Sequence, residues 1–281
     1  MPPYAKLVVV DNPAAVAALT DAIRVSTVSR LQEHVHRFTG CSKLLGRFAD
    51  LCAAWEAGSV PNARQITDSV NELRIALRLI QDAKCKRLEY EPRLDGTDKT
   101  IDFMLINTEG KRIFYDVKTL LPEGGDGWAL YQKAKANGWF TPGTKLDLDE
   151  EFGGPELAHY AFATRDKFIH YSLELEQKVR YVAKDGETYF RIVFCGDNFR
   201  WHQSDLEDFA DTYFGRPTPW DHLALMQKYM MQEKGWTWDR SIHDFCYFQR
   251  GPSQPTETNF VCNLKGPGFP ERVRSRRPQQ T

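Results

Sequence analysis

The sequence predicts an α/β fold, in which a central mixed sheet of four or five strands carries helices and follows an N-terminal group of helices. Three observations support this fold class. Apolar residues recur at three- and four-residue steps over much of the first 80 residues, as in amphipathic helices. Between residues 88 and 120 the apolar period changes to two, as in strands. Segments of both kinds then alternate as far as residue 235.

The helical region is punctuated by glycines. Residues 12–40 hold two helices with a break near Ser26, and residues 42–58 form another that closes at Gly58. A long helix follows, and its apolar stripe consists of Ile66, Val70, Leu73, Leu77 and Ile80.

Strands are expected at residues 88–94, 100–106, 112–120 and 188–196, and the segment 107–111 reads as a turn. Further helices are expected at residues 129–136, 165–182, 203–215 and 220–235, the first of them inside a long loop over residues 121–155. The expected organisation is a helical extension over 1–60, an α/β core over 61–250, and a Pro-, Gly- and Arg-rich tail over 251–281.

Composition excludes several classes of function. The formal net charge is −1, so attraction of a polyanion needs a local patch. No apolar run approaches the 18 or so residues of a membrane span. The six cysteines form no CxxC pair and the histidines no HExxH motif, which argues against a zinc site. Reduced thiols and a cytoplasmic location are the expectation.

An acid and a lysine two residues apart interrupt the apolar strand "RIFYDVKTL", at Asp116 and Lys118. The chain holds four such acid-x-Lys triplets, but those ending at Lys84 and Lys178 fall on expected helices and that ending at Lys111 in a turn. On a strand, residues i and i+2 share a face. The alternative interpretation is an exposed edge strand with an ion pair worth about 0–1 kcal/mol.

Two further acids belong to the same pattern. A five-residue turn that pairs Ile106 with Arg112 places Asp102 opposite Asp116, and like charges in that arrangement need compensation. Mg²⁺ prefers oxygen ligands from one or two carboxylates. Glu72, on the long helix just before the strands, could reach the same ion; alternatively it is an exposed acid that pairs with Arg74 or Arg78.

This arrangement resembles the PD-(D/E)xK nuclease superfamily: a helix acid, an acid opening one strand, and Asp-x-Lys on the next. The resemblance covers residues 71–120, less than a fifth of the chain. It implies a restriction-endonuclease-like α/β/α sandwich. Asp102, Asp116 and the Val117 carbonyl would bind Mg²⁺ or Mn²⁺, with Glu72 supporting. Lys118 would orient or deprotonate the attacking water and stabilise phosphate charge.

The match departs from the family pattern at two places. Ile101 stands where the motif has proline. Gln132 lies after the lysine, somewhat like the additional glutamine of RecB-like members, and would contact substrate, but the tyrosine that usually follows is missing from its place. An ordinary polar role for Gln132 is the alternative.

The expected function is a Mg²⁺-dependent nuclease, an endonuclease acting on DNA rather than RNA, by in-line attack of a metal-activated water. A homodimer is compatible with this expectation, and membrane association is not expected. Two alternatives stay open: an RNA-directed nuclease, and a non-catalytic nucleic-acid-binding or assembly module that retains the fold. The aromatic segments "GWFTPG", "NFRWHQ" and "KGWTWDR" could stack on bases or pack internally, and "RVRSRR" could contact phosphates or be solvated.

Overall fold

A computed structural model describes residues 17, 20–58, 64–120, 155–180, 182, 186–196, 200–216, 238–250 and 258–265. The described helices are a π-helical turn η3 (Arg24–Val28), α2 (Ser29–Glu33), a 3₁₀ turn η4 (Val35–Arg37), α3 (Cys41–Glu56), α4 (Arg64–Ile80), α7 (Pro155–Val179) and α8 (Arg200–Tyr213). The described strands are β1 (Phe38–Thr39), β2 (Cys85–Tyr90), β3 (Phe103–Asn107), β4 (Arg112–Thr119), β5 (Thr188–Gly196), β6 (Asp244–Arg250) and β7 (Thr258–Lys265).

Within this described part of the chain the strands form one mixed seven-stranded sheet, in the order β1-β2-β3-β4-β5-β6-β7. Strands β2, β3 and β4 form an antiparallel meander, β5 and β6 continue parallel to β4, and β7 returns antiparallel to β6. The α/β class is therefore confirmed, and β4 is an interior strand. The long helix α7 lies between β4 and β5 in the chain, which is the connection that a parallel pair requires.

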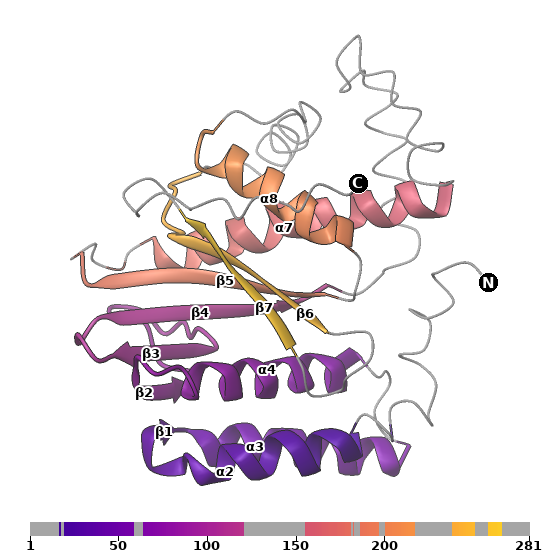
Figure 1. The fold of residues 1–281 in the computed structure, drawn as a ribbon, viewed down its shortest axis with the longest axis vertical. Helices are drawn as coiled ribbons and strands as arrows, with labels where there is room; N and C mark the ends of the chain where they lie inside the picture. Colours follow the sequence, from indigo (N-terminus) through magenta and orange to yellow (C-terminus); the bar gives the residue numbers. More distant parts are fainter. Residues whose placement is uncertain are drawn as a thin grey trace, which may run out of the picture.

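Helices cover both faces of the sheet (Figure 1). One apolar cluster joins α7 and α8 to one face and includes Phe114 and Phe194. A second cluster joins α3 and α4 to the other face and includes Tyr115 and Val193. Neighbouring strand residues thus enter different clusters, as the two-residue period of a strand requires. By this alternation Asp116 faces the α7 and α8 side.

The hairpin of β3 and β4 has the predicted register, with Ile106 paired to Arg112. Its turn is held by Asn107, whose Oδ1 accepts hydrogen bonds from the Glu109 and Lys111 amides at 3.0 and 2.9 Å. Gly110 supplies the positive φ of 86° that closes the turn. The next pair beyond Phe103 and Tyr115 in this register would be Asp102 and Asp116.

Other predicted elements needed correction. The expected strand over residues 88–94 begins and ends earlier as β2, and α7 starts ten residues before its expected start at residue 165. Strands β1, β6 and β7 were not predicted, and β7 lies inside the expected tail over residues 251–281. Strand β1 is only two residues long, and β6 contains the continuous apolar run Phe245 to Phe248, which shows no two-residue period.

The N-terminal helices pack on the sheet and on α4. Ile23, Leu31 and Leu44 are fully buried in the same cluster as Leu73 of α4, and β1 pairs with β2. The expected break near Ser26 falls within the π-helical turn η3. The expected helices over residues 129–136 and 220–235 lie outside the described residues.

Cysteine usage also differs from expectation. Cys41, Cys52, Cys85 and Cys195 carry free thiols, but Cys246 in β6 is disulfide-bonded. The expectation of reduced thiols is therefore wrong at Cys246, and the cytoplasmic location stays a prediction. In the described ranges, no helix combines the length and the apolar character needed to span a bilayer.

Candidate functional site

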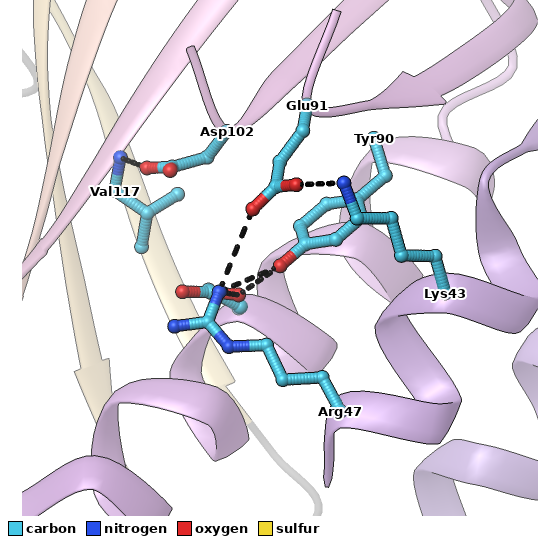
Figure 2. Close-up of polar contacts among 7 residues, drawn as sticks. Lys43, Arg47, Tyr90, Glu91, Asp102 and Val117 are labelled. Carbon is cyan, nitrogen blue, oxygen red and sulfur yellow. Dashed lines mark hydrogen bonds and ion pairs between the residues drawn. The ribbon is translucent and has the colours of Figure 1, made fainter. Parts of the chain in front are cut away.

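The two predicted aspartates come together where β3 begins. Asp102 lies one residue before β3, and its Oδ2 accepts a hydrogen bond from the backbone amide of Val117 at 2.6 Å. In the hydrogen-bond ladder between β3 and β4, the Asp102 carboxylate is thus the acceptor for the Val117 amide, where a backbone carbonyl would otherwise be the acceptor. Figure 2 shows the Asp102 carboxylate directed at Val117 of β4. Val117 contacts Asp102 through its backbone amide. Metal binding by the Val117 carbonyl stays a prediction.

Asp116 is fully buried and lies between two lysines. Its Oδ2 pairs with Lys118 Nζ at 2.9 Å, and its Oδ1 accepts a hydrogen bond from Lys178 Nζ of α7 at 3.0 Å. Each carboxylate oxygen of Asp116 therefore has a lysine ammonium group beside it. A buried carboxylate needs such neighbouring charge, because desolvation of an isolated ion is very costly.

The two aspartates act on each other electrostatically. Burial and the charge of Asp116 together raise the pKa of Asp102 to about 7, although Lys118 and the Val117 amide oppose the shift. Glu72 adds to the same shift, which places its charge near Asp102 as well. The charges of Asp116 and Glu72 therefore both act on Asp102.

Lys118 is mostly buried, and its ammonium group lies 5.6 Å from the ring centre of Tyr171 on α7. Burial lowers the pKa of Lys118, but the charges of Asp116 and Asp102 outweigh burial and leave the pKa above its ordinary value. Lys118 is therefore a cation at neutral pH. A cation can orient water and neutralise phosphate charge, whereas a general base must be deprotonated.

Glu72 of α4 contacts Arg47 and Tyr90, whose side chains are labelled in Figure 2. Its Oε2 accepts a hydrogen bond from the Tyr90 hydroxyl at 2.9 Å and lies 3.5 Å from Arg47 Nη1. Burial raises the pKa of Glu72, and Arg47 and Tyr90 oppose that effect. The alternative of an exposed Glu72 paired with Arg74 or Arg78 is wrong, because the Glu72 side chain is 12% exposed and pairs with Arg47.

The donor set fits a divalent cation in part. Asp102 and Asp116 are carboxylates whose mutual repulsion a cation would relieve. Among the described residues, however, no group of three or more Asp, Glu, His or Cys side chains has metal-binding geometry. Two carboxylates are enough for Mg²⁺, which keeps several waters when it binds. A divalent cation held by Asp102 and Asp116 therefore stays a prediction.

Two residues of the site, Lys178 and Arg47, were not predicted from the sequence. Lys178 belongs to the Glu176-Gln-Lys178 triplet, which is helical as expected. Its two charged side chains therefore point in different directions. Lys178 contacts Asp116, and Glu176 accepts a hydrogen bond from Tyr213. Arg47 lies in the region expected to be an extension. Neither position carries a local sequence signal, because both depend on helix packing. Gln132 lies outside the described residues.

The exposed-edge interpretation of Asp116 and Lys118 is also wrong, since β4 is interior and Asp116 is fully buried. Of the aromatic segments, Trp238 packs against the apolar cluster of α7 and α8. Trp201 belongs to α8, and the other tryptophans and phenylalanines of these segments, like the "RVRSRR" sequence, lie outside the described residues.

Comparison of the chain with protein-family models gave no match, and neither curated proteins nor solved structures gave one.

Proposed function

We propose that the protein is a divalent-metal-dependent nuclease of the PD-(D/E)xK type, acting on DNA. The observation that supports this proposal most strongly is the electrostatic group of Asp102, Asp116 and Lys118 on one hairpin, with Glu72 beside it. The mixed sheet with helices on both faces is compatible with a restriction-endonuclease-like fold. The residues share chemistry that phosphodiester hydrolysis requires: paired carboxylates and a nearby cation.

In this proposal Asp102 and Asp116 hold Mg²⁺ or Mn²⁺, which supplies positive charge at the phosphate and lowers the pKa of water. Lys118 orients the attacking water and neutralises charge that develops on the phosphate oxygens. Its raised pKa favours this role over proton abstraction. Glu72 supports the site from α4. Lys178 holds the second oxygen of Asp116 and fixes the orientation of that carboxylate.

Cleavage assays test the proposal. Supercoiled plasmid, linear duplex, single-stranded DNA and RNA are each incubated with Mg²⁺ and with EDTA. We expect plasmid nicking that EDTA abolishes, and a loss of at least about 100-fold in the rate for Lys118→Ala, because a group that stabilises transition-state charge is removed. Lys111→Ala is the matched control, because Lys111 pairs with Glu109 on the exposed turn of the same hairpin. Equal rates for wild type and Lys118→Ala would refute the assigned role.

A second candidate function is a non-catalytic nucleic-acid-binding or assembly module. The observation in its favour is that lysines contact both oxygens of the buried Asp116, which is also what a purely structural ion pair requires. Calorimetry with Mn²⁺ distinguishes the two functions. The nuclease requires a binding heat that Asp116→Ala abolishes, whereas no difference between wild type and variant favours the binding module.

A further inference from the structure

Helix α3 belongs to the region expected to be an N-terminal extension. Two of its basic side chains, Lys43 and Arg47, point toward the candidate site. Arg47 Nη1 donates a hydrogen bond to the Tyr90 hydroxyl at 2.9 Å and lies 3.5 Å from Glu72 Oε2 and 3.6 Å from Glu91 Oε1. Lys43 pairs with the other oxygen of Glu91. Figure 2 shows Arg47 and Lys43 reaching from the helix toward Tyr90 and Glu91, beside Asp102.

The backbone just after β2 places the Glu91 carboxylate beside Lys43 and Arg47. Glu91 has a φ of 49°, a left-handed conformation that costs a non-glycine residue free energy unless its surroundings hold it. Its amide donates a hydrogen bond to the Asp102 carbonyl at 2.8 Å, which joins it to the start of β3. Gly40, just before α3, lies so close to Tyr90 that an added Cβ would come within 3.2 Å of Tyr90 Cβ. Helix α3 is therefore held tightly against β2.

The charges of this group balance. Glu72 and Glu91 contribute two negative charges, and Arg47 and Lys43 two positive ones. Arg47 is thus already paired with acids of the protein. Its guanidinium connects an acid on α4 with an acid at the end of β2, and the Tyr90 hydroxyl bonds to both Arg47 and Glu72. Such a network restricts the rotamers available to the buried Glu72 carboxylate.

We infer that Arg47 is a positioning residue, which holds Glu72 in the orientation that the proposed nuclease site needs. The inference rests on the proposed function, and it makes the N-terminal helical region part of the site. Residues that orient metal ligands through hydrogen bonds typically change metal affinity or activity by about 10- to 100-fold when they are removed.

Kinetic variants test this role. Arg47→Ala should lower kcat about 10- to 100-fold and weaken Mn²⁺ binding in calorimetry by a similar factor, with KM for duplex DNA within about twofold of wild type. Arg47→Lys should recover part of kcat, because it keeps the charge. A raised KM with unchanged kcat would mean that Arg47 contacts substrate phosphate directly, and would overturn the positioning role.

A matched control separates positioning from general destabilisation. Arg37, in the same N-terminal region, donates hydrogen bonds to the Cys85 and Ile80 carbonyls and contacts none of these acids. Arg37→Ala should lower the urea midpoint of unfolding while kcat stays unchanged at temperatures where the protein is folded. An equal loss of kcat in Arg37→Ala would overturn the inference.

A thermodynamic cycle tests the Arg47 contact without any reaction. The urea midpoints of Arg47→Ala, Glu72→Gln and the double variant are compared in EDTA. If Arg47 and Glu72 interact, the urea midpoint of the double variant should fall by less than the sum of the decreases in the two single variants. Additive decreases would overturn the inference even if the protein cleaves DNA. A wild-type protein that neither binds Mn²⁺ nor cleaves would refute the proposed function instead, and with it the catalytic purpose of the contact.

Discussion

At the scale of the residue, Asp102 combines two demands on one carboxylate. Its Oδ2 accepts a hydrogen bond from the Val117 amide at 2.6 Å, and the carboxylate also lies near the charge of Asp116. The hydrogen bond favours the ionised form, whereas burial and the neighbouring charge favour the neutral form and prevail. This balance makes Asp102 a sensitive reporter of the site in the metal-free protein.

We predict that Asp102 makes the stability of the metal-free protein depend on pH. Its pKa is about 7 in the folded state, against 3.8 as the reference value, so the folded protein binds the proton more tightly. This contribution to stability is complete below about pH 4 and is lost as the pH rises through about 7. Wild type should therefore lose on the order of 2 kcal/mol between pH 5 and pH 8 from this group.

Urea unfolding in EDTA at pH 5, 6, 7 and 8 measures this dependence. Asp102→Asn keeps an oxygen for the Val117 amide but does not titrate, so its stability should fall less steeply with pH. Asp95→Asn is the control: Asp95 is an exposed acid that bonds Arg112. Parallel curves for wild type and Asp102→Asn would contradict the prediction.

Lys178 supports a second prediction at the residue scale. Its removal leaves Asp116 Oδ1 buried without that partner, so Lys178→Met should lower the free energy of unfolding in EDTA by about 2 kcal/mol. If Asp116 binds a divalent cation, Mg²⁺ should then raise the melting temperature more in Lys178→Met than in wild type, because the added charge replaces the lost one.

The measurement is thermal unfolding with EDTA and with Mg²⁺. Lys99→Met is the matched control, since Lys99 donates a hydrogen bond to the Gln177 carbonyl of the same helix and does not contact Asp116. An identical Mg²⁺ effect in wild type and Lys178→Met would be evidence against metal binding at Asp116.

At the scale of the element, the β3–β4 hairpin determines which acids meet. Its register follows from the turn at Asn107 and from the alternation that sends Phe103 and Leu105 into the cluster of α3 and α4. A slip by one residue would send these apolar side chains to the opposite face. The same register sets Asp102 beside β4 at the level of Asp116 and Val117.

We predict that the turn depends on the side-chain oxygen of Asn107. Asn107→Ala removes the acceptor of the Glu109 and Lys111 amides and should cost about 1–2 kcal/mol of unfolding free energy. Asn107→Asp keeps the acceptor and should stay close to wild type. Urea unfolding of both variants measures the difference, and an equal loss in Asn107→Asp would show that the hydrogen bonds are not the cause.

At the scale of the whole molecule, the site lies where one strand pair meets helices from both layers. Helices α7 and α4 lie on opposite sides of the sheet (Figure 1). Helix α7 contributes Lys178 and Tyr171, and α4 contributes Glu72. The N-terminal helices complete the second layer, and their Arg47 reaches Glu72. Residues far apart in the sequence therefore meet around the ends of β2 and β4 and the start of β3.

The sequence alone determined the α/β class, four strands of the sheet, the hairpin register and the grouping of Asp102, Asp116 and Lys118. These features depend on local physics: the two-residue period of strands, turn chemistry around Asn107 and Gly110, and the spacing between paired positions. Each can be read within a window of about 20 residues. The pairing of Lys118 with Asp116 is of this local kind.

Only the tertiary structure decided which distant side chains join that group. Lys178 and Arg47 enter through the packing of α7 and α3, and β6 and β7 join the sheet through pairing across long connections. Helical periodicity identifies a buried face, but it does not specify the strand against which the face packs or which polar residue at its edge meets a partner. That choice depends on the combined burial of both apolar clusters, which no short segment encodes.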